Sequence, residues 1–200
     1  MVTLVYPSQA FNNTSLISKQ PTLFNQSPTG KSASRFDGGH QWRIEASHPG
    51  LFKSQHAQVD GFLEYVGKHT KFKVLLPDRA TPRGVATGSP AVNNVGGYAE
   101  GVSSIAIDGC TASVTDWLMA ADFFSFASHD KVYMNTSDVN TNGSGETTLT
   151  FEPPLKQAIL DGDVLTVNNV SFVVVSVNNH GYSIGNDNLY NMDMTLMEAA

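Results

Sequence analysis

Hydrophobic and polar residues alternate three times between positions 123 and 155, and each alternation predicts a β-strand. Apolar side chains at every second position lie on one face of a sheet. The three segments are Phe123–Ala127, Val132–Asn135 and Thr148–Phe151. Asn142–Gly145 tolerates positive φ, so we expect the chain to reverse there, and Pro153 ends the third strand because proline cannot donate to a ladder. The sequence therefore predicts a small antiparallel unit. Within it, the alternation predicts that Val132 and Met134 share the apolar face.

The remaining periodic segments lie on both sides of this unit. Residues 1–28 are weakly patterned and predict an irregular arm, or an edge strand followed by a loop. Spacings of three and four residues predict one helix over 52–68 that ends at Gly67. Its apolar stripe consists of Phe52, His56, Val59, Phe62, Leu63 and Val66. Further strands are expected at Trp42–Ala46 (broken by His48–Gly50), Phe72–Leu76, Val164–Val167, Phe172–Val177 and Met192–Leu196.

Charge divides the chain of 200 residues unevenly. Residues 88–168 contain ten acidic side chains against Lys131 and Lys156, so the net charge of this block is about −8, whereas that of the whole chain is −6. The rest of the chain is near +2. The segment Pro77–Pro90 contains three prolines and two glycines, a composition typical of a connection. We expect residues 88–168 to form a separate domain, inserted between the two halves of another. The five or six short strands expected in this block suit a small barrel.

Composition narrows the class of protein further. A hydrophobic content of 40% is enough for a buried core, and glycine, proline, threonine and asparagine favour short strands over long helices. The single cysteine, Cys110, predicts a buried apolar residue rather than a reactive thiol. The first ten residues lack the features of a secretory signal, and no apolar run is long enough to span a bilayer. We therefore expect a soluble protein made in a reducing cytoplasm, without membrane insertion by this chain.

Several motifs suggest catalysis, and each is better explained by structure. Gly30-Lys31-Ser32 resembles the end of a phosphate-binding loop, but no helix is expected after it. The six histidines show no metal spacing; His56 belongs to the helix stripe, and His129-Asp130 is expected at a solvated loop tip.

Two further sets of residues suggest glycoside hydrolysis or sugar binding. The carboxylates considered for glycoside hydrolysis are Asp122, Asp130, Glu146 and Glu152. The aromatic residues considered for a sugar platform are Trp117, Phe123, Phe124 and Phe126, which we expect in the core instead. We predict no catalytic residue, no cofactor and no metal site.

A longer pattern resembles a known family. It reads D-x-F-x-F-x-S-x-x-K-V-Y-x-x-x-x-D, followed by a Gly/Asn turn, T-L-x-F-E-P-P-L and D-G-D-x-V. Here its parts are Asp122–Asp138, Thr148–Leu155 and Asp161–Asp163, and Leu165 stands at the position of the last valine. Upstream come a tryptophan-bearing strand, a helix, a strand and LLPDRATPRG (Leu75–Gly84). From about Ser34 to the C-terminus, the chain resembles the distal tail protein (Dit) family of long-tailed siphophages.

This resemblance implies a definite architecture and role. The expected fold is mainly β: a sandwich-like or barrel-like α+β collar domain with one helix, formed by residues 1–87 and 169–200. Residues 88–168 would form an inserted OB-like β-barrel. The protein would be a virion structural protein, not an enzyme. Six copies would close into a ring that joins the tail tube protein to the tail tip or baseplate hub. Genomic DNA would pass through the channel without specific binding.

Two other classes of function remain as alternatives. A carbohydrate-binding module at the tail tip would contact host glycans through exposed aromatic side chains of the insert. A tail-associated glycosidase would need two of the scattered carboxylates to be paired by the fold.

Overall fold

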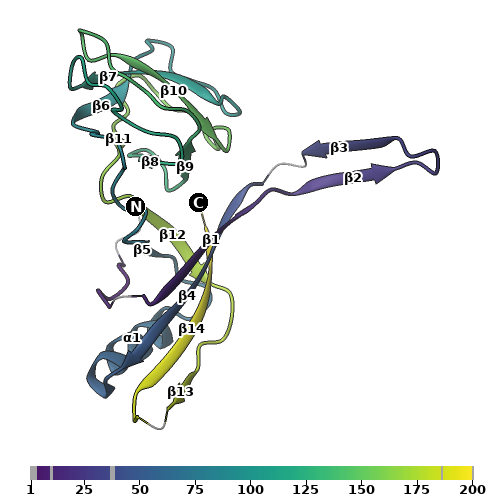
Figure 1. Cartoon of the computed structure of the whole chain (residues 1–200), viewed down its shortest axis with the longest axis vertical. Helices are drawn as coiled ribbons and strands as arrows, with labels where there is room; N and C mark the ends of the chain where they lie inside the picture. Colours follow the sequence, from purple (N-terminus) through teal and green to yellow (C-terminus); the bar gives the residue numbers. More distant parts are fainter. Residues whose placement is uncertain (1–3, 10, 37–38, 186, 200) are drawn as a thin grey trace. The chain divides into compact units, whose positions relative to one another are not determined.

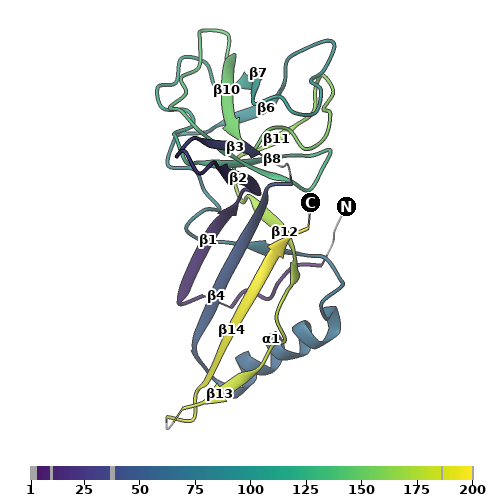
Figure 2. The same cartoon turned by 90° about the vertical axis from the view of Figure 1, so that its right-hand side faces the viewer.

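The computed structural model describes residues 4–9, 11–36, 39–185 and 187–199 (Figures 1 and 2). Within them the chain is mainly β, with a single helix. In chain order the elements are β1 (Asn13–Lys19), β2 (Thr22–Gln26), β3 (Ser32–Phe36), β4 (Gln41–Leu51), α1 (Lys53–Val66), β5 (Phe72–Leu75), β6 (Gly88–Val92), β7 (Ser104–Cys110), β8 (Phe123–Phe126), β9 (Val132–Asn135), β10 (Thr147–Glu152), β11 (Leu165–Thr166), β12 (Ser171–Ser176), β13 (Tyr182–Ile184) and β14 (Tyr190–Glu198).

The described residues fall into two compact units. Residues 4–72 and 174–199 form the first, which we call the sheet unit, and residues 73–173 form the second, the barrel unit. The chain passes from one unit to the other within strands β5 and β12.

The sheet unit is centred on long strands that pair antiparallel in the order β1, β4, β14. The continuous apolar run of β12 joins β14 on its other side, and β13 also pairs with β14. Alternation along β4 buries Trp42, Ile44 and Ala46, and the register places Met194 and Leu196 of β14 beside Ala46 and Ile44. These side chains form the inner face of the sheet. The predicted strands at Trp42–Ala46 and Met192–Leu196 are therefore confirmed.

Helix α1 confirms the predicted helix, with one exception. His56, Val59, Leu63 and Val66 recur at helical spacing and are buried, while Gly67 closes the helix at φ 55°. Phe52, predicted to belong to this stripe, instead precedes the helix and is mostly exposed. Its side chain lies outside the stripe because Phe52 is the N-cap, where the backbone is extended at φ −66° and ψ 154°.

The predicted break at His48–Gly50 is wrong, because β4 continues to Leu51. His48 pairs with Met192 and Leu51 pairs with Tyr190, so β4 contains one more residue than β14 over this stretch. That extra residue is a β-bulge, which accommodates the Pro49 nitrogen without a ladder hydrogen bond.

The barrel unit contains a six-stranded sheet in the order β11, β8, β9, β10, β7, β6. A bridge between Ala91, in edge strand β6, and Val164, just before β11, brings the two edges together, so the sheet is nearly closed. Its core includes Trp117, Phe124 and Phe151, all 0–1% exposed. The prediction of five or six short strands in a small barrel is confirmed. The strands at 123–126, 132–135 and 147–152 are those expected from the alternation.

The predicted orientation of β9 is wrong. Tyr133 pairs with Phe124 and lies within 5.8 Å of its ring centroid, so Tyr133 and not Met134 joins the central aromatic cluster. Tyr133 and Asn135 are fully buried, whereas Met134 is partly exposed. The amide nitrogen of Asn135 is accommodated on this face because it donates to the carbonyls of Met119 and Ser137.

Strands β2 and β3 form a separate two-stranded sheet, which we call the arm (residues 22–36). It follows β1 and precedes β4 in the chain, and Figure 1 shows it beyond the ends of these strands. The weakly patterned first 28 residues thus contain the expected edge strand, β1, but the expected loop after it includes a second strand. The pattern gave no signal for β2 because neither of its faces is buried.

Candidate assembly surfaces

The arm exposes apolar side chains without covering them. Leu23 is 54% exposed and Phe24 is 67% exposed. Cross-strand pairing places Phe24 opposite Ser34 and Leu23 opposite Arg35, so the two apolar side chains lie on opposite faces of the ribbon. Both outer edges of this two-stranded sheet lack a further strand among the described residues. A solvent-exposed ribbon with free edges and apolar side chains is typical of a surface that binds another protein.

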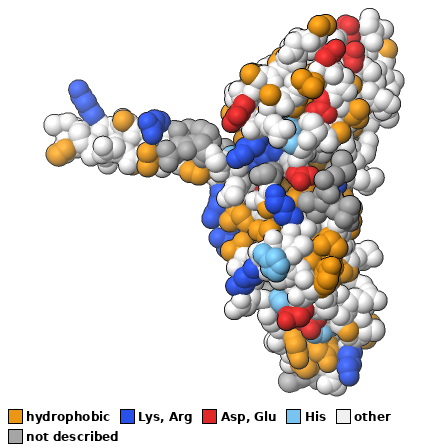
Figure 3. Space-filling view, turned by 180° about the vertical axis from the view of Figure 1, so that it is seen from behind, with side chains coloured by type: hydrophobic (Ala, Val, Ile, Leu, Met, Phe, Trp, Pro, Cys, Tyr) orange, Lys and Arg blue, Asp and Glu red, His pale blue; other side chains and the backbone are white. Residues whose placement is uncertain are grey.

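The arm is also basic. Residues 22–36 contain Lys31 and Arg35 and no acidic residue. Counting the flanking Lys19 and Asp37 leaves this balance unchanged at +2. Figure 3 shows Lys/Arg and hydrophobic side chains side by side on the visible face of the arm. Gly30-Lys31, considered for phosphate binding, lies in the turn of this hairpin, where the Ser27 N–H donates to the Lys31 carbonyl at 2.8 Å. No helix N-terminus is therefore offered to a phosphate there.

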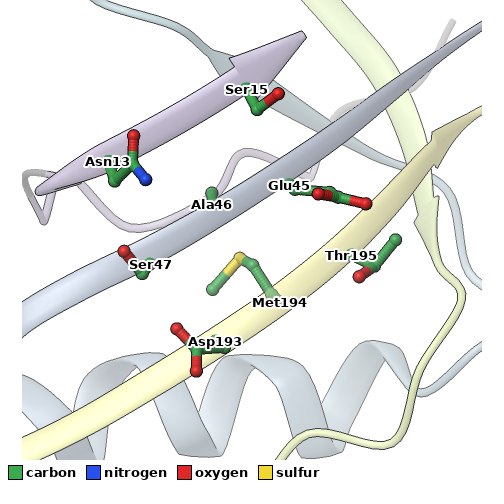
Figure 4. Close-up of a pocket in the computed structure, with 8 residues that line it drawn as sticks. All are labelled: Asn13, Ser15, Glu45, Ala46, Ser47, Asp193, Met194 and Thr195. Carbon is green, nitrogen blue, oxygen red and sulfur yellow. The ribbon is translucent and has the colours of Figure 1, made fainter. Parts of the chain in front are cut away.

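The outer face of the sheet unit is a second candidate surface (Figure 4). Strands β1, β4 and β14 place their outward side chains in cross-strand rows. The rows are Asn13–Ser47–Asp193, Ser15–Glu45–Thr195 and Ile17–Arg43–Met197. The first two rows line a hollow of about 410 Å³. Hydroxyl, amide and carboxylate side chains of these two rows thus line the hollow, on the side of the sheet opposite its buried apolar face.

Electrostatically, this outer face is weakly acidic. The Arg43 guanidinium lies 2.6 Å from the Glu45 carboxylate, so the cation of the three rows is paired with an acid of the same strand. Asp193 adds a further carboxylate beside the hollow. The three rows therefore carry one cation and two anions, a balance that gives a polyphosphate no net attraction.

The histidines considered earlier occupy different environments. His56 is buried on α1, with its ring 4.5 Å from those of Tyr182 and Tyr190, which confirms its place in the helix stripe. His129 does not lie at a solvated loop tip as predicted. Its Nε2 lies 2.8 Å from the Tyr133 hydroxyl and its ring stacks on Phe126, so it is half-buried. Burial lowers the pKa of His129, although the neighbouring Asp163 and Asp130 oppose this.

Two of the four carboxylates considered for glycoside chemistry, Asp122 and Glu146, are bonded within the barrel unit. Asp122 is buried and accepts backbone N–H groups, and Glu146 accepts from the Asn142 side chain at 2.9 Å. The aromatic residues considered for a sugar platform are all buried, as the core prediction required: Trp117, Phe123, Phe124 and Phe126. Buried rings cannot stack on a sugar, so the structure does not favour the carbohydrate-binding alternative.

The buried state of Cys110 is also confirmed, and burial raises the pKa of its thiol to about 12. Among the described residues, no group of three or more His, Cys, Asp or Glu side chains is arranged to hold a metal ion. In the same part of the chain, α1 is too short and too polar to cross a bilayer.

Neither the arm nor the outer sheet face was predicted from the sequence as a separate surface. The available signal for the arm was the Ser27–Gly30 turn between two short polar segments, which is typical of a hairpin. The signal for the outer face was the set of polar residues that alternate with the buried apolar residues in β4 and β14.

Comparison with known proteins gives one informative similarity. No family model matches the chain. The chain is similar to the distal tail protein pb9 of Escherichia phage T5, with 29% identity over 191 residues. The similarity covers 89% of this chain and 90% of the relative, so it includes both units. It supports a phage distal tail protein, a structural protein located in the tail of the virion that interacts with other tail proteins.

Proposed function

We propose that this protein is a ring-forming subunit of the distal end of a phage tail. Six copies close into a ring that joins the tail tube to the tip or baseplate hub, and the ring leaves a channel for genome ejection. The role is structural, without catalysis. In this proposal residues 1–87 and 169–200 are the collar, and residues 88–168 are an inserted OB-like domain.

The observation that carries this proposal is the similarity to the T5 distal tail protein over nine-tenths of both chains. A similarity confined to the barrel would suit many binding modules, because small barrels serve many functions. This one covers 89% of the chain, so it extends into the sheet unit as well.

The sheet unit offers surfaces suited to a ring. A closed ring needs a heterologous contact in which one patch of a subunit binds a different patch of the next. Strand β1 is an edge of its sheet, and both arm strands have free outer edges among the described residues. Such edges bind further protein through main-chain hydrogen bonds unless they are protected. The exposed Phe24 provides an apolar anchor on the same segment.

The outer sheet face is suited to the wall of a genome channel. Double-stranded DNA binds surfaces whose Lys and Arg side chains neutralise phosphates and release counterions. On this face Arg43 is already paired with Glu45, and Asp193 adds a negative charge. A channel lined by these rows lets DNA pass without holding it. Residues Asn13, Ser15, Ser47 and Thr195 supply uncharged polar groups that keep the wall hydrated.

Exchange of one exposed aromatic residue tests the ring. Phe24→Ser removes the anchor of the arm, whereas Tyr65→Ser removes a similarly exposed aromatic side chain (73%) from α1. Neither exchange touches the core, so both variants should melt like the wild type. We expect Phe24→Ser to lose rings in electron micrographs and Tyr65→Ser to keep them. Equal ring formation by all three proteins would contradict a role of the arm in the contact.

A further inference from the structure

Two neighbouring turns of the barrel unit expose apolar side chains that nothing in the unit covers. We call residues 93–98 and 159–163 the turn pair. Val95 is 96% exposed and Leu160 is 75% exposed. Such values in a well-bonded turn are informative, because a large aliphatic side chain at a turn apex contributes nothing to the core beneath it.

The turn pair is held in one conformation by hydrogen bonds between its two segments. Tyr98 and Ile159 exchange both backbone hydrogen bonds, at 2.9 and 3.0 Å. The Asn94 N–H donates to the Asp161 carboxylate at 2.9 Å. Gly97 adopts φ +64°, and a Cβ at this position would collide with the Ile159 carbonyl oxygen, so only glycine permits this approach. Val95 and Leu160 are therefore presented on a preorganised support, which lowers the entropy cost of binding.

The turn pair is acidic. It contains Asp161 and Asp163 and no basic residue. Asp163 is fixed by the Ser128 hydroxyl, which donates to its carboxylate. In Figure 3 acidic side chains are distributed over the barrel, in agreement with the ten acids against two lysines in residues 88–168.

We propose that the arm of one copy docks on the turn pair of the next copy. This inference rests on the proposed ring, and it names the two patches that form the contact. The occupant of the turn pair is thus a second copy of this chain, bound through Leu23 or Phe24 together with the basic residues of the arm.

Complementarity of charge and polarity supports this choice of partner. The arm is a +2 segment with two exposed apolar side chains, and the turn pair is a −2 segment with two exposed apolar side chains. Apolar contacts supply the binding free energy, and opposite charges guide the two patches together and fix their register. The two patches differ, so the contact is heterologous, as closure of a ring by rotation requires.

A pair of introduced cysteines tests the contact. The protein carries Ser34→Cys, opposite Phe24 in the arm, and Asn93→Cys, in the turn pair, so the exposed apolar side chains of both patches are kept. A short bifunctional maleimide joins thiols that lie close. Native Cys110 gives little background, because it is buried and its pKa of about 12 keeps the thiolate scarce. The matched control combines Ser34→Cys with Val85→Cys, since Val85 is an exposed valine of the same unit outside the turn pair. Purified protein and intact tails are both treated.

The expected result is a ladder of covalent multimers on a denaturing gel for the first pair and at least a tenfold weaker ladder for the control. Equal ladders, or a product confined to single chains, would overturn the inference. Electron micrographs of the same samples score ring formation separately. Rings without a ladder would show that the arm binds elsewhere and would leave the proposed function intact. Protein found outside any ring in intact tails would overturn the proposed function itself.

Discussion

The carboxylate of Asp122 accepts the backbone N–H of Arg83 at 2.9 Å. It also accepts the N–H groups of Gly84, at 3.2 Å, and Met119, at 2.8 Å. Asp122 begins the D-x-F-x-F pattern, and Arg83 and Gly84 end the LLPDRATPRG segment. One buried side chain therefore ties together the two sequence patterns on which the family resemblance depends.

Replacement of this carboxylate should destabilise the barrel unit. Asp122→Asn keeps the volume but places an amide NH2 against backbone donors, so we expect a loss of about 1.5–3 kcal/mol in the free energy of unfolding. Urea denaturation followed by tryptophan fluorescence measures it, because Trp117 lies in the same core. The control is Arg83→Ala, whose exposed side chain should contribute less than about 1 kcal/mol. Equal effects of the two substitutions would show that the backbone contacts of Asp122 are unimportant.

The packing of α1 on the sheet unit predicts a large effect at Leu63. Leu63 is buried on the apolar stripe of the helix. Leu63→Ala removes three carbon atoms from a packed site and should cost roughly 2–5 kcal/mol in the free energy of unfolding. Tyr65→Ala, on the exposed side of the same helix, should cost far less. A cost below about 1 kcal/mol for Leu63→Ala would mean that this face of α1 is not packed.

A chain of hydrogen bonds in the barrel unit can be completed by neutral His129. The Lys156 N–H donates to the Tyr133 hydroxyl, whose oxygen lies 2.8 Å from His129 Nε2 and can donate to it when the neutral ring carries its hydrogen on Nδ1. On the other side of the ring, His129 Nδ1 lies 3.1 Å from the Ser128 hydroxyl, which donates to Asp163. Protonation at Nε2 would place a donor against the Tyr133 hydroxyl and force its hydrogen away. This geometry agrees with the lowered pKa of His129, which is caused by burial.

Stability of the barrel unit should therefore fall in mild acid. The folded-state pKa of His129 lies below its ordinary value near 6.5, so the unfolded chain binds the proton first. The stabilising contribution is complete above pH 6.5 and is lost as the pH falls below it, by at most about 1.4 kcal/mol per pH unit for one group. The midpoint of urea denaturation, measured at several values between about pH 7.5 and pH 5, reports the loss, because histidine titrates in roughly this range. His129→Gln should flatten the profile, and an unchanged slope in this variant would assign the loss to other groups.

The outer sheet face predicts a specific defect in genome passage. Glu45→Lys together with Asp193→Lys converts this face from weakly acidic to basic, and both side chains are far from fully buried. Virions with this double variant should assemble tails and eject DNA more slowly, because lysines retain phosphates, and added salt should restore the rate. Time-resolved ejection in vitro measures this. The matched control exchanges Asp60 and Glu64 of α1 for lysine, and an equal delay in both variants would contradict a channel position of this face.

Much of the fold could be predicted from the sequence, because most strands bury one face and therefore alternate. The orientation of β9 could not, since Val132 and Tyr133 are both buried, and the Tyr133 hydroxyl and the Asn135 amide nitrogen find partners inside the unit. Hydrophobicity alone predicts that Met134 is the buried residue and Tyr133 the exposed one. The pairing of Tyr133 with Phe124 instead places Tyr133 in the core. The continuation of β4 through Pro49 was also hidden, because a bulge removes the need for a proline N–H.

The candidate surfaces were harder to predict than the core. The arm has no buried face, so its strands leave no periodic pattern, and Phe24 among polar residues carries no sign of its exposure. The turn pair was recognisable only in part, through Asp161-Gly162-Asp163 as a turn signal. Its proximity to Val95 depends on the bonds between Tyr98 and Ile159, which lie 61 positions apart in the chain.

The most direct test of the account is to image this protein inside intact tails. A small epitope inserted after Gly143, in the exposed turn before β10, is labelled with a bound antibody fragment and viewed along and across the tail axis by electron microscopy. We expect six labels in one closed ring at the far end of the tail tube. Labels distributed along the tube, or absent from purified tails that carry a complete tip, would contradict it.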